Sequence, residues 1–269
     1  MLSDHQAPGA PAGPQGLDDA AVARRVADAA GRALLAVRAE HAGASDLKAR
    51  GDRGAQEVIA AELAALRPQD AVLSEEAVDD PARLDAERVW IVDPLDGTRE
   101  FGEGDRHDWA VHVALWERGD LVAGAVALPA LGRTLVTSDV GAPWREAPLE
   151  GRRPRLAVSR SRATDVVTGL ARALGLDLVP LGSAGYKTSA VVLGEVDAYV
   201  HTGGQYEWDS AAPVAVARAA GLFTSRVDGS PLTYNRRDPL LPDLVVCRPE
   251  LSDAILDHLS QTTTERETA

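Results

Sequence analysis

The sequence predicts a mixed α/β protein in two halves, with an α+β N-terminal half and an α/β C-terminal half. Three observations favour this fold class: two helical patterns open the chain, a meander of strand patterns follows, and strands then alternate with helices. A segment rich in Pro, Gly and charged residues at 141–154 separates the two parts. We therefore place the halves at 17–150 and 151–260, with disordered tails at 1–16 and 261–269.

Two helices are predicted at the start of the N-terminal half. Apolar residues recur at helical spacing over 17–40, after the acidic start signal Asp18-Asp19. A second helical pattern covers 52–66 and stops before Pro68, which cannot continue a helix. The N-terminal half therefore begins with a pair of helices.

Short apolar runs bounded by turn residues predict the strands of the N-terminal half. They cover 71–73, 88–92, 110–116, 121–128 and 133–138. The first two runs lead directly into acidic residues, whereas the other three form the meander. Acidic side chains are therefore expected at the ends of neighbouring strands.

Strand and helix patterns alternate in the C-terminal half. We expect strands at 155–158, 178–181, 197–200 and 244–247, and helices at 164–174, 185–194, 209–220 and 250–259. No apolar run reaches the roughly 18 residues that a membrane span requires, and no signal-peptide pattern opens the chain. We therefore expect no membrane partner.

The composition limits the partners and the compartment. The formal net charge of −13 argues against a nucleic-acid binder, because a phosphate backbone would be repelled. Small phosphorylated substrates remain allowed, since metal ions held by carboxylates reverse the local field. The single cysteine, Cys247, excludes an internal disulfide and fits a reducing cytoplasm. The sequence leaves a homodimer open.

The strongest chemical signal is the hexapeptide DPLDGT at 93–98, directly after the apolar run VWIV. Asp93 and Asp96 can point to one place, where two carboxylates repel each other unless a cation lies between them. Gly97 and Thr98 can offer backbone amides to a phosphate. The alternative is a helix cap at Asp96 with Asp93 in a turn. A chance match to four fixed residues is expected about once in 10⁵ positions.

Two further acidic signals follow the same logic but are weaker alone. Glu75-Glu76 ends a predicted strand, and one of the two side chains can reach the same sheet edge. The alternative is a solvated loop. Asp209 follows Trp208 and precedes an apolar helical run, so the alternative there is a simple N-cap.

Taken in order, the segments VLSEE, WIVDPLDGT and EWDSAA resemble the inositol monophosphatase superfamily, the lithium-sensitive magnesium phosphatases. The resemblance extends over about 17–260. It implies a layered αβαβα sandwich with the site between the two halves, and a Mg²⁺-dependent phosphomonoesterase with two or three ions per site.

The resemblance also implies the roles of individual residues. The metal ligands would be Glu75, Asp93, the Leu95 carbonyl, Asp96 and Asp209. The catalytic residues would be Glu75, Asp52 and Thr98, the last two acting as a pair that orients and deprotonates water. Gly97 and Thr98 would bind the phosphate. The family's longer stretch before Asp52 is shortened here to KARG at 48–51.

The segments TREF at 98–101 and SRSR at 159–162 resemble the branch of 3′-phosphoadenosine 5′-phosphate phosphatases, the CysQ type. The substrate-binding residues would then be Arg160, Arg162, Ser183 and Lys187. Lys187 is one of only two lysines among 28 basic residues. The alternative for SRSR is a solvated basic turn.

This branch implies hydrolysis of 3′-phosphoadenosine 5′-phosphate to AMP and phosphate in sulfate assimilation. Inositol-1-monophosphatase and fructose-1,6-bisphosphatase activities are the alternatives within the superfamily. A non-catalytic metal- or phosphate-binding module is the alternative from another class, although it would need no pair that orients water.

Overall fold

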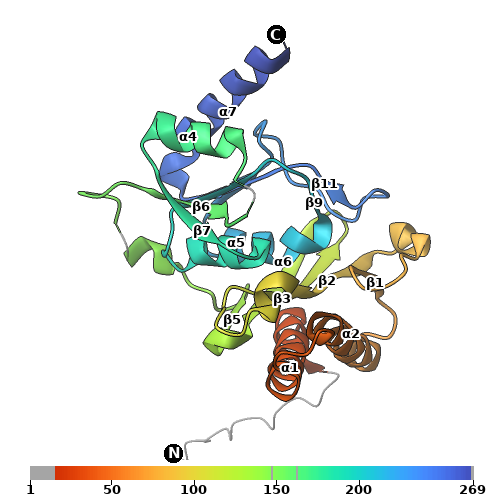
Figure 1. Cartoon of the computed structure of the whole chain (residues 1–269). Helices are drawn as coiled ribbons and strands as arrows, with labels where there is room; N and C mark the ends of the chain where they lie inside the picture. The colour runs from red at the N-terminus through yellow and green to blue at the C-terminus, as the bar shows by residue number, and fades with distance from the viewer. Residues whose placement is uncertain (1–15, 147, 162, 268–269) are drawn as a thin grey trace, which may run out of the picture.

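Two five-stranded sheets form the framework of the computed structural model, which describes residues 16–146, 148–161 and 163–267 (Figure 1). In spatial order the first sheet comprises β1 (Ala71–Ser74), β2 (Arg88–Asp96), β3 (Ala110–Glu117), β4 (Asp120–Leu128) and β5 (Arg133–Val136). Strand β1 pairs with β2 in parallel, and the other neighbours are antiparallel. The second sheet has the order β10 (Phe223–Ser225), β12 (Leu244–Cys247), β8 (Ala198–His201), β6 (Arg155–Ser159) and β7 (Asp177–Leu181).

Helices fill the layers outside and between the sheets. The helices are α1 (Asp19–Glu40), α2 (Leu47–Leu66), α3 (Thr98–Gly102), α4 (Asp165–Leu174), α5 (Ala184–Val192), α6 (Glu207–Ala219) and α7 (Ser252–Glu267). Helices α1 and α2 pack on the outer face of the first sheet, and α6 packs on its inner face. Helices α5 and α6 separate the two sheets, while α4 and α7 cover the far face of the second sheet. The layered αβαβα sandwich is therefore confirmed.

The apolar run in β2 is explained by burial on both faces. Trp90 and Val92 pack among the residues of α1 and α2, whereas Val89 and Ile91 pack with the middle helices. Because successive strand side chains point to opposite faces, a strand covered on both sides is apolar throughout.

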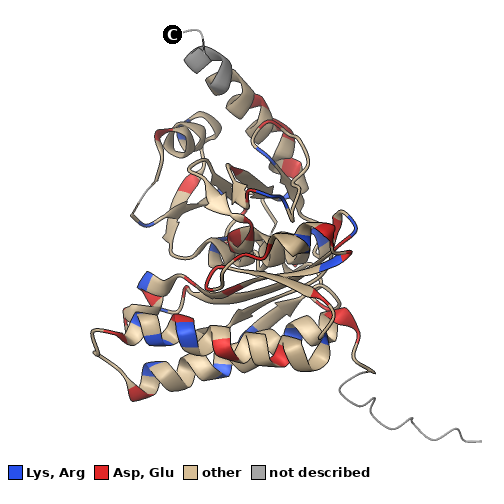
Figure 2. Ribbon diagram, turned by 90° about the vertical axis from the view of Figure 1, so that its right-hand side faces the viewer, with Lys and Arg blue, Asp and Glu red and all other residues tan. Residues whose placement is uncertain are grey.

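Figure 2 shows that both signs of charge are interspersed along α1 and α2.

Helix α2 begins at Leu47, five residues before the predicted start at 52. The KARG segment at 48–51 is therefore helical. Leu47, Gly51, Ala55 and Ile59 are buried at a spacing of four residues, so the apolar stripe continues through the glycine. A Cβ atom at Gly51 would lie 2.7 Å from the Phe101 ring, and this close approach explains a glycine inside a helix.

Strand β2 continues to Asp96 rather than ending at 92 as predicted. Pro94 lacks a backbone N–H, and the register with β3 shifts between Asp93 and Asp96. This irregularity keeps the motif in the sheet while breaking the regular alternation of its side chains.

Other boundaries also differ from the expected ones. Helix α6 begins at Glu207, so Asp209 lies in its first turn and its carboxylate accepts the N–H of the cap residue, Tyr206, at 2.6 Å. Helix α7 continues to Glu267, beyond the predicted end at 259, because neither Gly nor Pro interrupts it. Most of the predicted N-terminal tail, residues 1–15, and residues 268–269 of the C-terminal one lie outside the described residues.

Several short elements have no strong sequence signal. Strands β9 (Gln205–Tyr206) and β11 (Leu240–Leu241) form a two-stranded ribbon, and β10 was also unexpected. The 3₁₀ helices are η2 (Pro81–Asp85), η3 (Pro129–Leu131), η4 (Pro143–Glu146) and η5 (Pro249–Leu251). In the part of the chain that the structure describes, no helix combines the length and apolar character needed to cross a bilayer.

Candidate metal centre and substrate pocket

Three carboxylates converge where the end of β2 meets the start of α6. Asp93, Asp96 and Asp209 each place one oxygen within 4.8 Å of the others. Asp93 and Asp96 are buried, with 1% and 7% of their surfaces exposed, and Asp209 is half-buried. Such a set of close, buried acidic groups is stable when a cation offsets their repulsion.

The hydrogen bonding of the Asp93 carboxylate shows whether the site suits a cation. Its Oδ1 atom accepts the N–H of Leu95 at 2.9 Å, but its Oδ2 atom has no hydrogen-bond partner among the described residues. Burial, with the charges of Asp96 and Glu75, raises the pKa of Asp93 well above its ordinary value. A buried carboxylate oxygen without a partner, facing other carboxylates, suits a hard divalent cation.

Glu75 approaches the cluster from the end of β1, although the residue is exposed and is not one of the three carboxylates that lie within 4.8 Å of one another. Because β1 and β2 are parallel neighbours, their C-terminal ends lie at the same end of the sheet. Burial raises the pKa of Glu75 to about 7, and the charges of Asp96 and Glu76 act in the same direction. Burial and Asp96 likewise raise the pKa of Asp209 to about 7. Three of the four predicted acidic ligands therefore form one close set, and Glu75 interacts with them electrostatically from outside it.

Asp96 is held by the start of α5. Its carboxylate accepts the backbone N–H of Gly185 at 2.6 Å and that of Ala184 at 3.2 Å. The hydroxyl of Ser183 donates to the same carboxylate. Ser183, predicted to bind substrate, therefore lines the pocket and also orients a candidate metal ligand.

His112 was missed by the sequence analysis. This buried histidine on β3 has Nδ1 3.0 Å from the carbonyl oxygen of Trp208 and Nε2 3.3 Å from Oδ2 of Asp96. It thus lies between β2 and the residue that precedes Asp209. A Cβ atom at Gly185 would stand 1.8 Å from its Nε2, so the glycine makes room for the ring. The available signal was a lone histidine inside the apolar run AVHVAL.

The predicted pair Asp52 and Thr98 is also brought together. The Thr98 hydroxyl lies 3.4 Å from Oδ1 of Asp52 on α2 and 3.1 Å from the carbonyl oxygen of Leu95. Burial, with the charge of Glu76, raises the pKa of Asp52 to about 6. Gly97 precedes Thr98 with φ +86°, and a Cβ atom there would lie 3.0 Å from Ser183, so the motif requires glycine.

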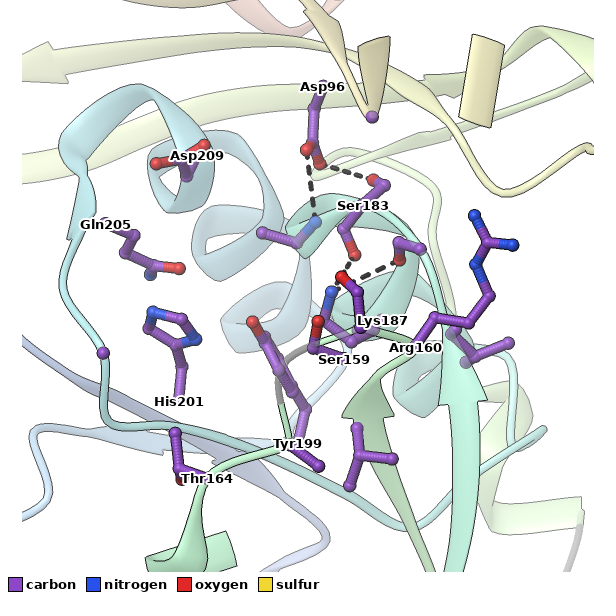
Figure 3. Close-up of a pocket in the computed structure, with 18 of the residues that line it drawn as sticks. Asp96, Ser159, Arg160, Thr164, Ser183, Lys187, Tyr199, His201, Gln205 and Asp209 are labelled. Atoms are coloured by element: carbon purple, nitrogen blue, oxygen red, sulfur yellow. Dashed lines mark hydrogen bonds between the residues drawn. The ribbon is translucent and has the colours of Figure 1, made fainter. Parts of the chain in front are cut away.

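A pocket of about 930 Å³ opens beside these groups (Figure 3). Asp96 and Asp209 lie at one end of it, and Thr164 lies at the other. Lys187, Ser159 and Arg160 form one side, and Gln205 and His201 form the opposite side. The pocket is much larger than a single phosphate group and lies within the range of small-molecule sites.

The basic residues predicted to bind substrate have protein partners. Lys187 is buried, and its Nζ donates to the carbonyl oxygens of Gly182 and Ser183 at 3.3 and 2.5 Å. Burial lowers the pKa of Lys187. Arg160 donates to Glu100 and Glu103, at 2.9 Å in each case. Arg162, the fourth predicted substrate contact, lies outside the described residues.

Comparison with known proteins gives consistent matches. The model of the inositol monophosphatase family matches residues 17–264. A Mycobacterium leprae protein named 3′-phosphoadenosine 5′-phosphate phosphatase is 48% identical over 89% of this chain and 93% of its own. The Escherichia coli K12 protein named 3′(2′),5′-bisphosphate nucleotidase CysQ is 32% identical, covering 71% of this chain and 80% of its own. The crystal structure of CysQ from Bacteroides thetaiotaomicron superposes with a TM-score of 0.71 at 28% identity, covering 86% of this chain and 97% of that one.

Proposed function

This chain belongs to the inositol monophosphatase family, and we propose that it is a Mg²⁺-dependent phosphatase converting 3′-phosphoadenosine 5′-phosphate into AMP and phosphate. The observation that carries the proposal is the carboxylate cluster at the end of the large pocket, with one buried oxygen of Asp93 left without a partner. The substrate is taken from the names of the Mycobacterium leprae and Escherichia coli relatives.

Asp93, Asp96, Asp209 and Glu75, with the carbonyl oxygen of Leu95, would hold the Mg²⁺ ions. All these ligands are oxygens, as a hard cation requires. When bound, Mg²⁺ supplies Lewis acidity and lowers the pKa of a coordinated water. Ser183 and the N–H groups of Ala184 and Gly185 keep the Asp96 carboxylate in place for this role.

Asp52 and Thr98 would hold the attacking water. When the Thr98 hydroxyl donates to Oδ1 of Asp52 rather than to the carbonyl oxygen of Leu95, the oxygen lone pairs of Thr98 are left to accept a hydrogen bond from the water. A carboxyl group with a pKa of about 6 is mostly ionised at neutral pH, so Asp52 can accept the proton that passes through Thr98. Gly97 and Thr98 would offer their backbone N–H groups to the phosphate.

The remainder of the pocket would accommodate the nucleoside and the second phosphate. Lys187 and Arg160 lie on one side of the pocket, where Arg160 is paired with Glu100 and Glu103 and Lys187 supplies the positive charge. The ammonium group of Lys187 has three N–H groups. Two of them donate to backbone carbonyl oxygens, and these two hydrogen bonds fix the direction of the third. We assign the remote phosphate to this side.

We also propose a cytoplasmic location, because a single buried cysteine needs no oxidising compartment.

A panel of phosphate-release assays tests this function. The purified protein is incubated with Mg²⁺ and either 3′-phosphoadenosine 5′-phosphate, inositol 1-phosphate or fructose 1,6-bisphosphate. We expect the highest kcat/KM for the adenosine bisphosphate and no release in EDTA. A higher value for either of the other two substrates would assign the chain to that activity. Absence of release from all three, with Mg²⁺ bound, would indicate a binding module.

A further inference from the structure

Gln205 carries an unsatisfied amide on the wall of the pocket. Its side chain is 7% exposed, and neither Oε1 nor Nε2 has a hydrogen-bond partner within residues 16–146, 148–161 and 163–267. The backbone of Gln205 is paired with Leu241 in the β9–β11 ribbon, so the residue is firmly placed. Figure 3 shows the amide beside the pocket, between Asp209 and His201.

A buried side-chain amide without hydrogen-bond partners in the protein is suited to binding a ligand. Buried side-chain amides are nearly always hydrogen-bonded, because burial without partners forfeits the bonds that water would provide. An amide presents a donor and an acceptor side by side. The complementary ligand therefore offers an acceptor and a donor side by side.

The chemistry of the surroundings selects among the parts of a nucleotide. A phosphate group only accepts hydrogen bonds, so Oε1 of Gln205 would face its negative charge unpaired. The basic residues Lys187 and Arg160 lie on the opposite side of the pocket. Next to Gln205, apart from the candidate metal ligand Asp209, the pocket wall carries Tyr206 and Leu240, which are exposed by 47% and 43% at the rim. The Tyr206 ring is stacked on Trp208 with centroids 4.7 Å apart, which gives this rim a fixed aromatic surface.

We propose that Gln205 recognises the edge of the adenine base. Oε1 accepts from the exocyclic amino group and Nε2 donates to the adjacent ring nitrogen, the pairing that glutamine forms with adenine elsewhere. The side chains of Tyr206 and Leu240 pack against the base. This inference rests on the proposed function and adds a specificity residue to it, on the wall opposite the predicted contacts Arg160 and Lys187.

The location of Gln205 couples base recognition to the metal centre. Gln205 lies four residues before Asp209, and the N–H of Tyr206 between them donates to the Asp209 carboxylate. A base held by Gln205 is therefore held relative to a candidate metal ligand through one short, hydrogen-bonded segment.

Two substrates and two forms of the enzyme test the contact. One substrate is adenosine 3′,5′-bisphosphate, and the other is purine riboside 3′,5′-bisphosphate, which lacks the amino group. The wild-type enzyme should prefer the adenosine substrate by roughly 10- to 100-fold in kcat/KM. In Gln205→Met, which keeps the side-chain length but removes both hydrogen-bonding atoms, this ratio should fall to near one. If the variant does not fold, Gln205→Asn, which withdraws the amide by one methylene, should show the same fall.

The outcomes separate this inference from the proposed function. If the wild-type enzyme hydrolyses both nucleotides and the ratio is unchanged in the variant, Gln205 does not contact the amino group and the inference is wrong. An equal loss on both substrates would mean that Gln205 supports the fold or the metal centre, which also overturns it. If the wild-type enzyme releases no phosphate from either nucleotide, the proposed function itself fails.

Discussion

The backbone N–H of Gly185 donates to Oδ2 of Asp96 over 2.6 Å, although the two residues belong to different layers of the protein. Asp96 lies at the end of β2 in the first sheet, whereas Gly185 is in the first turn of α5, between the two sheets. The start of α5 therefore holds a candidate metal ligand in place. The N–H of Ala184 and the hydroxyl of Ser183 donate two further hydrogen bonds to the same carboxylate.

This relationship predicts that Ser183 controls metal affinity. Ser183→Ala removes a hydrogen bond that orients Asp96, and loss of such a bond typically lowers metal affinity by about 10- to 100-fold. The Mg²⁺ concentration giving half-maximal activity should rise accordingly. Ser189→Ala, which removes another buried hydroxyl from α5, is the matched control and should leave that concentration unchanged. Equal behaviour of the two variants would show that Ser183 does not support the metal site.

The unpaired oxygen of Asp93 predicts opposite effects on stability and on activity. Asp93→Asn removes one of the mutually repelling charges, so the metal-free protein should melt at a higher temperature than the wild type at pH 8. The same change removes a ligand charge, so Mg²⁺-dependent turnover should be lost. Calorimetry and phosphate release measure the two effects. Asp120→Asn, at the exposed start of β4, should change neither. An active Asp93→Asn enzyme would remove Asp93 from the site.

The raised pKa values of Glu75 and Asp209 predict how pH affects the metal-free protein. Both pKa values are about 7 in the folded state and near 4 in an unfolded chain, so the folded state binds more protons between these values. The stability that these groups contribute is present below about pH 4 and is lost as the pH rises through about 7. Mg²⁺ competes with those protons. Its effect on the melting temperature should be small at pH 5 and large at pH 8; the reverse order would contradict the proposed cluster.

The acidic cluster could be expected from the sequence, although Glu75 and Asp209 were weak signals alone and were assigned through the family resemblance. Asp93 and Asp96 share one hexapeptide, and Glu75 and Asp209 each lie at an element boundary that apolar patterning reveals. The five layers were implied by the family resemblance, and the apolar pattern of β2 agrees with them because helices cover both of its faces.

The contacts between layers could not be predicted in this way. His112 and Gly185 are distant in sequence, and neither has a motif, yet the ring of one occupies the space left by the other. Gln205 is on a two-residue strand that carries no periodicity. The start of α2 was predicted five residues too late, because the close packing of Gly51 on Phe101 and Leu95, which accounts for a glycine inside the helix, cannot be seen in the sequence.

The pairing of Thr98 with Asp52 predicts a defect in the chemical step. Thr98→Ala and Asp52→Asn should each reduce kcat by about 10²–10⁴-fold while changing KM little, because both residues act on the attacking water in the transition state. Thr98→Ser keeps the hydroxyl and should retain most of the activity. Steady-state kinetics with the adenosine bisphosphate provide the comparison. A raised KM with unchanged kcat would give the pair a structural role only.

Product analysis tests the central claim most directly. The protein is incubated with 3′-phosphoadenosine 5′-phosphate and Mg²⁺, and the phosphorus-containing products are identified by ³¹P NMR. We expect inorganic phosphate and 5′-AMP in equal amounts, with neither formed in EDTA or by Asp93→Asn, because in the proposed function the metal centre acts on the 3′-phosphate and the side of the pocket with Lys187 receives the 5′-phosphate. Formation of adenosine 3′-phosphate, or an unchanged substrate spectrum, would contradict this account.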